Sequence, residues 1–154
     1  MRIEEDIKLD YADVLFRPKR STLHSRKDVE LKRTYSFKYS NHQWSGIPII
    51  AANMDGVGEL EIAQNLSKFE LMTCLTKQHD TKKIKHFSGI KEIYPHIILS
   101  CGTGEEDYKR INNLLKEYSF FEFICIDIAN GYSDHFSKFV SSVREKHPTK
   151  TIIA

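Results

Sequence analysis

Phe121-Glu-Phe-Ile-Cys-Ile-Asp-Ile-Ala-Asn-Gly131 is an apolar run that ends in polar and small residues, and a helical pattern follows it. Three earlier runs have the same form: Ile47–Ala52 before Asn53-Met54-Asp55-Gly56, Leu71–Leu75 before Thr76-Lys77-Gln78-His79, and Ile97–Leu99 before Ser100-Cys101-Gly102. A fifth apolar run covers residues 151–154. The runs start about 24 to 30 residues apart, which is the length of one strand, one helix and two short loops. The sequence therefore predicts parallel strands that alternate with helices, with functional residues after the carboxyl end of each strand.

Apolar stripes with helical spacing lie between these predicted strands. They are Leu60, Ala63, Leu66 and Phe69; Tyr108, Ile111, Leu114, Leu115 and Tyr118; and Phe136, Phe139, Val140 and Val143. Thr103 and Glu106 have the spacing of a capping box ahead of the second stripe. His147-Pro148 is expected to end the third helix. Residues 81–94 fit a helix less well, because Gly89 interrupts the pattern.

Parallel strands with right-handed crossovers leave two folds, an open doubly wound sheet and a (βα)8 barrel. Neither GxGxxG nor GxxxxGK[ST] follows the first strand, which argues against the open sheet. We therefore predict an α/β fold of the TIM-barrel type, with the first four βα units and strand five in residues 46–154 and an N-terminal arm in residues 1–45. A complete barrel has about 250 residues and eight units. The 154-residue chain is therefore expected to carry about half of a barrel and an unfinished site.

The predicted arm holds the densest charge of the chain, including Arg17-Pro18-Lys19-Arg20. This charge is typical of a solvated face, and a role in holding phosphate is the alternative. Val29–Tyr39 alternates loosely and Ser40-Asn41-His42 has the composition of a turn, so a small hairpin is expected here, with the arm packed over a barrel end. The net charge of +2 does not suggest a nucleic-acid partner. There is no apolar stretch near 18 residues, so no membrane span is predicted.

Three cysteines, Cys74, Cys101 and Cys125, lie in or at the end of apolar runs. Without paired spacing or a signal peptide, they are interpreted as reduced thiols of a cytoplasmic protein. The seven histidines lack the spacing of a zinc site, and no metal site is predicted.

Three longer motifs carry a resemblance to a known family: Leu9-Asp-Tyr-Ala-Asp-Val-Leu-Phe-Arg-Pro-Lys-Arg-Ser-Thr22, Pro48-Ile-Ile-Ala-Ala-Asn-Met-Asp-Gly-Val-Gly58 and Cys125-Ile-Asp-Ile-Ala-Asn-Gly-Tyr-Ser-Asp-His-Phe136. Together they resemble the GMP reductases, purine-salvage relatives of IMP dehydrogenase. The IMP dehydrogenases usually carry a large regulatory insertion after the second strand. Only 19 residues separate Lys77 from Ile97 here, which favours the reductases.

The resemblance implies an NADPH-dependent reductive deamination of GMP to IMP and ammonia. In that family a cysteine thiolate attacks C2 of the purine, ammonia leaves, and hydride from the nicotinamide reaches C2. The family's cysteine belongs to a loop after strand six, so Cys101 is not expected to be the nucleophile. The family also implies a bound monovalent cation, K⁺, whose ligands are not expected in this chain, and a homotetramer.

The same resemblance implies a role for seven residues. They are Ser25 and Arg26 for NADP contact, Lys77 as a catalytic residue near the reacting groups that also contacts the cofactor, Asp127, Ile128 and Ala129 for cofactor contact, and Met54 in the purine pocket. The chain departs from the family's usual pattern at Gly56, where threonine is typical, and at Thr76-Lys77-Gln78-His79, where His-Lys-His-Tyr is typical.

On the residues alone, each of these assignments has an alternative. Lys77 could be a surface lysine, Asp127 a helix cap and Met54 a core residue. For the whole chain, three hypotheses stay open: the amino-terminal portion of a GMP reductase, from a fragment or a truncated gene; a non-catalytic nucleotide-binding half-barrel, alone or completed by a second chain; and a degenerate product without a stable fold.

Overall fold

The computed structural model describes residues 6–154, and the chain divides into two compact units, Met1–Glu30 and Leu31–Ala154. This boundary lies earlier than the one predicted at residue 45, and the packing of the arm over a barrel end stays a prediction. Among the helices of residues 6–154, none is both long and apolar enough to cross a membrane.

The first unit contains two single turns of 3₁₀ helix, η1 (Tyr11–Asp13) and η2 (Arg26–Asp28). Each turn is closed by a reciprocal pair of side chains. In η2, the Ser25 hydroxyl accepts the Lys27 backbone N–H at 3.2 Å, and the Asp28 carboxylate accepts the Ser25 backbone N–H at 2.9 Å. These bonds satisfy backbone donors that a short helix leaves without partners.

The second unit begins with the expected hairpin, whose first strand lies within the predicted run 29–39 and whose turn contains residues 40–42. β1 (Arg33–Ser36) pairs antiparallel with β2 (Gln43–Gly46). The turn between them is closed by a bond from the Phe37 N–H to the His42 carbonyl at 2.9 Å. The second strand was missed because its two buried positions are a tryptophan and a glycine, which give no apolar alternation.

The core of the second unit is a parallel sheet in the order β3-β4-β5-β6-β7, which confirms the predicted parallel arrangement and the partial α/β barrel. The strands are β3 (Ile50–Ala51), β4 (Met72–Leu75), β5 (Ile97–Cys101), β6 (Phe123–Ile126) and β7 (Thr151–Ile153). All neighbouring pairs are parallel. The first predicted run, Ile47–Ala52, shortens to the two residues of β3, which is an edge strand of the described sheet.

Helices follow four of the strands: α1 (Leu60–Ser67) after β3; α2 (Thr81–His86), α3 (Ile90–Ile93) and the 3₁₀ turn η3 (Tyr94–His96) after β4; α4 (Glu105–Glu117) after β5; and α5 (Asp134–Lys146) after β6. The stretch 81–94, whose helical pattern Gly89 interrupts, is thus two short helices followed by the turn η3. Gly89 separates them with a φ of 98°, a left-handed conformation that favours glycine.

Two details of the predicted helices are wrong. Thr103 and Glu106 form no capping box, because α4 begins at Glu105 with Gly104 as its N-cap and no side-chain cap bond. Asp107 instead reaches back and accepts the Gly102 N–H at 3.1 Å. Phe69 is 67% exposed, because α1 ends at Ser67 and the following turn carries the ring away from the stripe.

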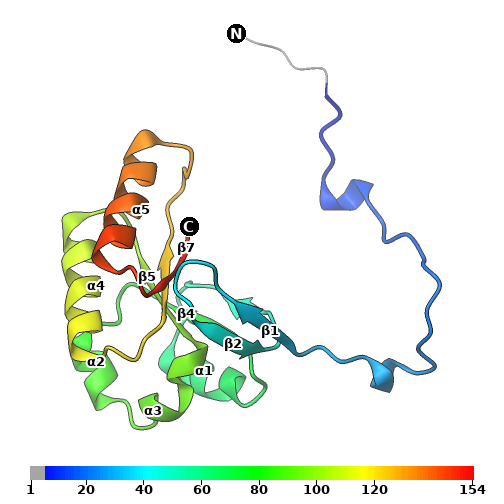
Figure 1. Ribbon diagram of the computed structural model, residues 1–154, viewed down its shortest axis with the longest axis horizontal. Coiled ribbons are helices and arrows are strands. Elements are labelled where there is room, and N and C mark those ends of the chain that lie inside the picture. Colours follow the sequence, from blue (N-terminus) through cyan, green and yellow to red (C-terminus); the bar gives the residue numbers. More distant parts are fainter. Residues whose placement is uncertain (1–5) are drawn as a thin grey trace. The chain divides into compact units, whose positions relative to one another are not determined.

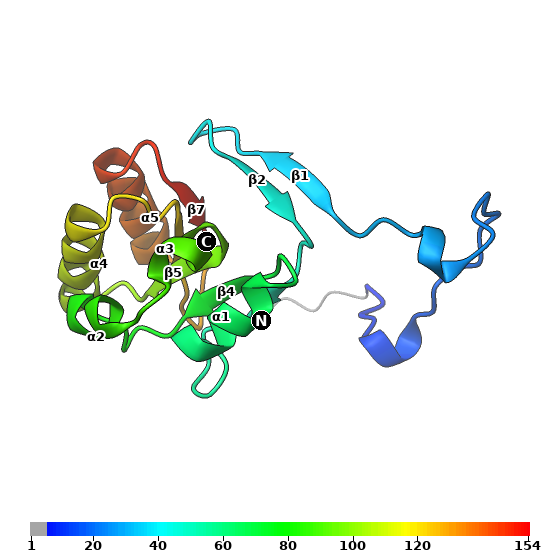
Figure 2. The same ribbon diagram turned by 90° about the horizontal axis from the view of Figure 1, so that it is seen from below.

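Side chains of the sheet belong to two separate hydrophobic cores, because alternate residues of a strand face opposite sides of the sheet. On β6, Ile124 belongs to the core under the helices, while Phe123 belongs to a second core under the hairpin. The buried residues of this hairpin-side core are Trp44, Met72, Cys74, Ile98 and Phe123. Figures 1 and 2 show α4 and α5 on one side of the strands and the β1–β2 hairpin on the other.

Candidate functional site

A polar cavity of about 320 Å³ lies at the carboxyl ends of the strands, and we call it the strand-end cavity. Its lining residues follow β3, β4, β5 and β6 or end these strands: Asn53, Asp55, Thr76, Lys77, Gln78, Ser100, Cys101, Gly102 and Asp127. Four sequence segments that are far apart in the chain therefore meet here. The carboxyl end is the edge at which parallel α/β barrels build their sites.

Lys77 and Asp127 both line this cavity. Both are predicted from the sequence as site residues, and they follow the carboxyl ends of two different strands, β4 and β6. Lys77 follows β4 and is exposed. Asp127 directly follows β6, and its carboxylate accepts a bond from the Asn53 side-chain amide at 3.0 Å. The Asp127 N–H donates to the Cys101 carbonyl at 2.9 Å. Asp127 is thus tied to the exits of both β3 and β5.

The alternative interpretation of Asp127 as a helix cap is wrong. The N-cap of α5 is Ser133, whose hydroxyl accepts the Phe136 N–H at 3.2 Å. The carboxylate of Asp127 instead lies at the cavity, where it accepts from the Asn53 amide.

Three other predicted residues follow cavity-lining residues in the sequence but do not line the cavity themselves. Met54 is 63% exposed, so the alternative of a core residue is wrong, while its neighbours Asn53 and Asp55 line the cavity. Ile128 is half-buried and Ala129 is exposed, directly after Asp127. The roles assigned to Met54, Ile128 and Ala129 stay predictions.

Ser25 and Arg26 belong to the first unit. Ser25 is the N-cap of η2, and Arg26 is the first residue of that turn. Both are exposed. Their contact with a dinucleotide stays a prediction.

The sequence did not single out Asn53, Asp55, Gln78 or Ser100 as site residues. The signal was present, because each of them stands in the polar stretch that ends an apolar run or follows it. What the sequence could not supply was the pairing of these stretches. Asn53 and Asp127 are 74 positions apart and meet only because β3 and β6 belong to the same sheet.

The three cysteines are free, and none has the properties of an activated nucleophile at the cavity. Cys101 lines the cavity but is 3% exposed, and burial raises the pKa of its thiol to about 12. A hydrogen bond with Cys125 and burial raise the pKa of Cys74 as well. Cys125 lies on β6 and packs against the hairpin-side core. The hydrogen bond with Cys74 lowers the pKa of the Cys125 thiol, but Cys125 does not line the strand-end cavity. A reactive thiol needs a lowered pKa and access to the site.

In residues 6–154, no three or more His, Cys, Asp or Glu side chains are grouped so that they could hold a metal ion. The cavity instead offers an ammonium group, carboxylates, amides and two hydroxyls. These groups suit the recognition of a polar organic ligand by hydrogen bonds and charge.

The sheet order and the position of the cavity define the class of protein: a parallel α/β barrel protein, here with five strands, whose site lies at the carboxyl ends. The family model described as "IMP dehydrogenase / GMP reductase domain" matches residues 8–154. The chain belongs to this IMP dehydrogenase / GMP reductase family.

Relatives in this family support that assignment. A GMP reductase of Citrobacter koseri is 49% identical over 156 residues, which cover 100% of this chain and 45% of that protein. A GMP reductase of Escherichia coli is 48% identical over the same coverage. The chain thus spans less than half the length of these relatives.

A solved structure supports the fold. The crystal structure of inosine 5′-monophosphate dehydrogenase from Legionella pneumophila matches with a TM-score of 0.67 and 23% sequence identity. The match covers 92% of this chain and 42% of that one.

Proposed function

We propose that this chain forms the amino-terminal part of the site of a GMP reductase, which reduces GMP to IMP and ammonia with NADPH in purine salvage. The observation that carries the proposal is the convergence of Lys77 and Asp127, from two different strands, on one polar cavity. The 49% identity with proteins named GMP reductase supports the choice within the family.

In this proposal, Lys77 and Asp127 bind and orient the reactants. The Lys77 ammonium donates hydrogen bonds into the cavity and places a positive charge beside the reacting purine. The Asp127 carboxylate accepts hydrogen bonds from the dinucleotide, and Asn53 holds that carboxylate in place through its amide. Ile128 and Ala129 extend the same contact, and Met54 covers the purine.

The residues present fit a phosphate-bearing dinucleotide by their chemistry. Arg26 offers a planar guanidinium that can donate to two phosphate oxygens at once. The Ser25 hydroxyl accepts a bond from the Lys27 N–H, and a hydroxyl can still donate its own proton. When bound, NADPH supplies the hydride. The attacking thiol is assigned to none of the three cysteines of this chain, because burial raises the pKa of Cys101 and neither Cys74 nor Cys125 lines the strand-end cavity.

A hybrid protein tests this function. The chain is joined to the remainder of the Citrobacter koseri GMP reductase, and NADPH oxidation is followed with GMP. We expect GMP-dependent oxidation, and we expect Lys77→Met to lower kcat by about 100-fold, the lower end of what a positioned proton-transferring group contributes. Lys109→Met is the matched control, because Lys109 is an exposed lysine of α4 outside the cavity.

Two results would contradict the proposal: no GMP-dependent oxidation by the hybrid, or full activity of Lys77→Met. Activity of the hybrid with IMP and an oxidised dinucleotide alone would assign the chain to the dehydrogenases instead. The proposal includes a cytoplasmic homotetramer, and the native mass of the hybrid tests the tetramer.

A further inference from the structure

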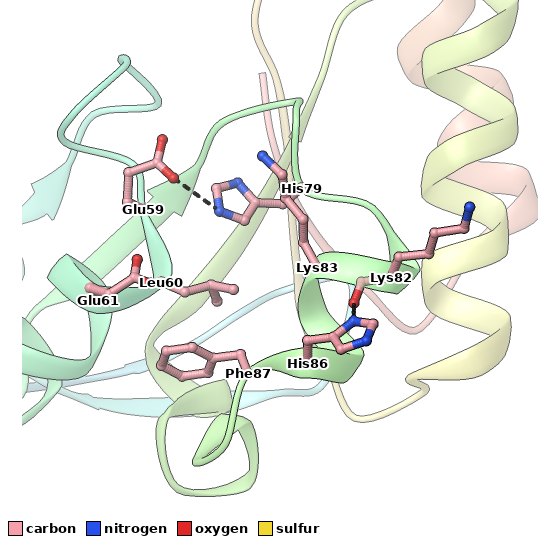
Figure 3. Close-up of a pocket in the computed structure, with 8 residues that line it drawn as sticks. All are labelled: Glu59, Leu60, Glu61, His79, Lys82, Lys83, His86 and Phe87. Atoms are coloured by element: carbon pink, nitrogen blue, oxygen red, sulfur yellow. Dashed lines mark hydrogen bonds and ion pairs between the residues drawn. The ribbon is translucent and has the colours of Figure 1, made fainter.

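The turn after β4 forms a wall between two cavities. Thr76, Lys77 and Gln78 line the strand-end cavity, whereas His79 lines a second cavity of about 450 Å³ beside α1 and α2. The other residues of this outer cavity are Glu59, Leu60, Glu61, Lys82, Lys83, His86 and Phe87. Figure 3 shows His79 facing Glu59 there. Two residues of one turn thus face different cavities, with Lys77 in the proposed site and His79 in the outer cavity.

His79 is buried and bonded at both ring nitrogens. Its residue exposure is 3%, and its Nε2 lies 3.2 Å from a carboxylate oxygen of Glu59, the N-cap of α1. Its Nδ1 lies 3.0 Å from the Thr76 hydroxyl and 3.2 Å from the Thr76 carbonyl oxygen. Nε2 donates to the Glu59 carboxylate, and Nδ1 contacts Thr76 on the opposite edge of the ring. Both ring nitrogens therefore anchor the imidazole.

The backbone of the turn is held at the same two residues. The Thr76 N–H donates to the Gly58 carbonyl at 2.9 Å, and Arg110 Nη1 donates to the His79 carbonyl at 3.0 Å. Gly58 permits this approach because a Cβ at that position would collide with the Cys74 carbonyl oxygen. The two residues between the anchors are exposed, and Gln78 reaches Asp55 only at 3.4 Å.

We propose that His79 is a positioning residue that holds Lys77 over the strand-end cavity, with Glu59 and Thr76 fixing the imidazole. The inference rests on the proposed function, since it gives Lys77 its role. A four-residue turn fixed at its first and last residues has little freedom at the two residues between them. The direction of the Lys77 side chain is therefore set by a buried polar contact on the far side of the turn.

Carbodiimide cross-linking of the 154-residue chain tests this role without any activity. The reagent joins an amine to a carboxylate that lies within contact distance, and mass spectrometry quantifies each pair. In the unaltered chain we expect Lys77 to couple to Asp127 or Asp55, which line the same cavity. The internal standard is the Lys150–Glu122 pair, whose charged atoms are 3.3 Å apart and far from the turn in sequence.

We expect His79→Ala and Glu59→Ala to lower the Lys77 coupling about fivefold relative to the standard, the effect of losing one net hydrogen bond. Glu59→Gln keeps a side-chain oxygen that accepts from Nε2 and should restore the coupling. His79→Gln keeps a donor near the Nε2 position, and His79→Asn keeps a polar group near Nδ1, so each should restore part of it.

Three results would overturn the proposal. They are no coupling of Lys77 to either carboxylate in the unaltered chain, unchanged coupling in both alanine variants, and an equal fall of the Lys77 and Lys150 pairs. The last result would mean that His79 only stabilises the fold. If His79→Ala does not fold, Glu59→Ala and Glu59→Gln decide alone. A selective fall of the Lys77 pair supports the positioning role even if the hybrid enzyme shows no turnover, so the two proposals can fail separately.

Discussion

The two ends of the parallel strands are built from different kinds of side chain. At the amino end, Trp44 and Phe123 are buried, and Phe37 of the hairpin packs edge-on against Phe123 at 5.5 Å between ring centroids. At the carboxyl end, Lys77 and Asp127 are exposed around a polar cavity. Stability and chemistry are thus separated along the strands. Substitutions of the buried rings at the amino end should change folding, whereas substitutions of the exposed side chains that line the strand-end cavity should change binding.

The largest effect on the free energy of unfolding is expected at the amino end of the parallel strands. Phe123→Ala removes a ring that is 1% exposed and contacts both Phe37 and His42 of the hairpin. The free energy of unfolding should fall by about 3–5 kcal/mol, because the lost burial adds to the cost of the cavity left behind. Urea denaturation of the chain measures this fall in the free energy of unfolding. Tyr132→Ala is the control, since that ring is fully exposed, and an equal loss there would contradict the separation.

Arg110 should give the next largest effect, because it ties two strand exits together from behind the cavity. Its guanidinium donates to the carbonyl oxygens of His79 and Ser100, and burial lowers its pKa. Arg110→Met should cost about 1.5–3 kcal/mol, the range for hydrogen bonds of charged groups. Lys109→Met on the exposed face of α4 should cost less than about 0.5 kcal/mol in the same denaturation series.

The N-cap of α2, Asp80, should give a smaller effect on stability, and it directly follows the turn after β4. It caps α2 by accepting the Lys83 N–H at 2.9 Å, and this bond lowers the pKa of its carboxyl from the usual value of an aspartate. Asp80→Ala should cost about 1 kcal/mol, as the loss of an N-cap does. Asp80→Asn, which keeps an acceptor oxygen, should cost less.

The lowered pKa also fixes the sign of a pH effect at Asp80. The stabilisation is complete above the unfolded-state pKa, near 4, and is lost as the pH falls through the lower folded-state pKa. Thermal denaturation between pH 6 and pH 2 should show this loss in the unaltered chain. Its contribution should be absent from Asp80→Asn, and identical pH profiles would refute the assignment.

The smallest effect on stability is expected at the site itself. Lys77→Met and Asp127→Asn change exposed side chains, so each should alter the free energy of unfolding by less than about 0.5 kcal/mol. Asp127→Asn keeps an acceptor for the Asn53 amide. A loss of several kcal/mol at either position would mean that the carboxyl end also carries the fold, and the comparison of the two ends would fail.

The sequence determined the alternation of strands and helices, the parallel order and the edge at which Lys77 and Asp127 stand. These features are local, because apolar runs and helical stripes consist of residues that are close together in the sequence. Tertiary structure decided the rest: the second hairpin strand, the start of α4 at Glu105, the bond between Asn53 and Asp127, and the burial of His79 against Glu59. These features depend on sheet register and on which helix packs beside which strand, and no periodicity within a single segment encodes a contact between segments.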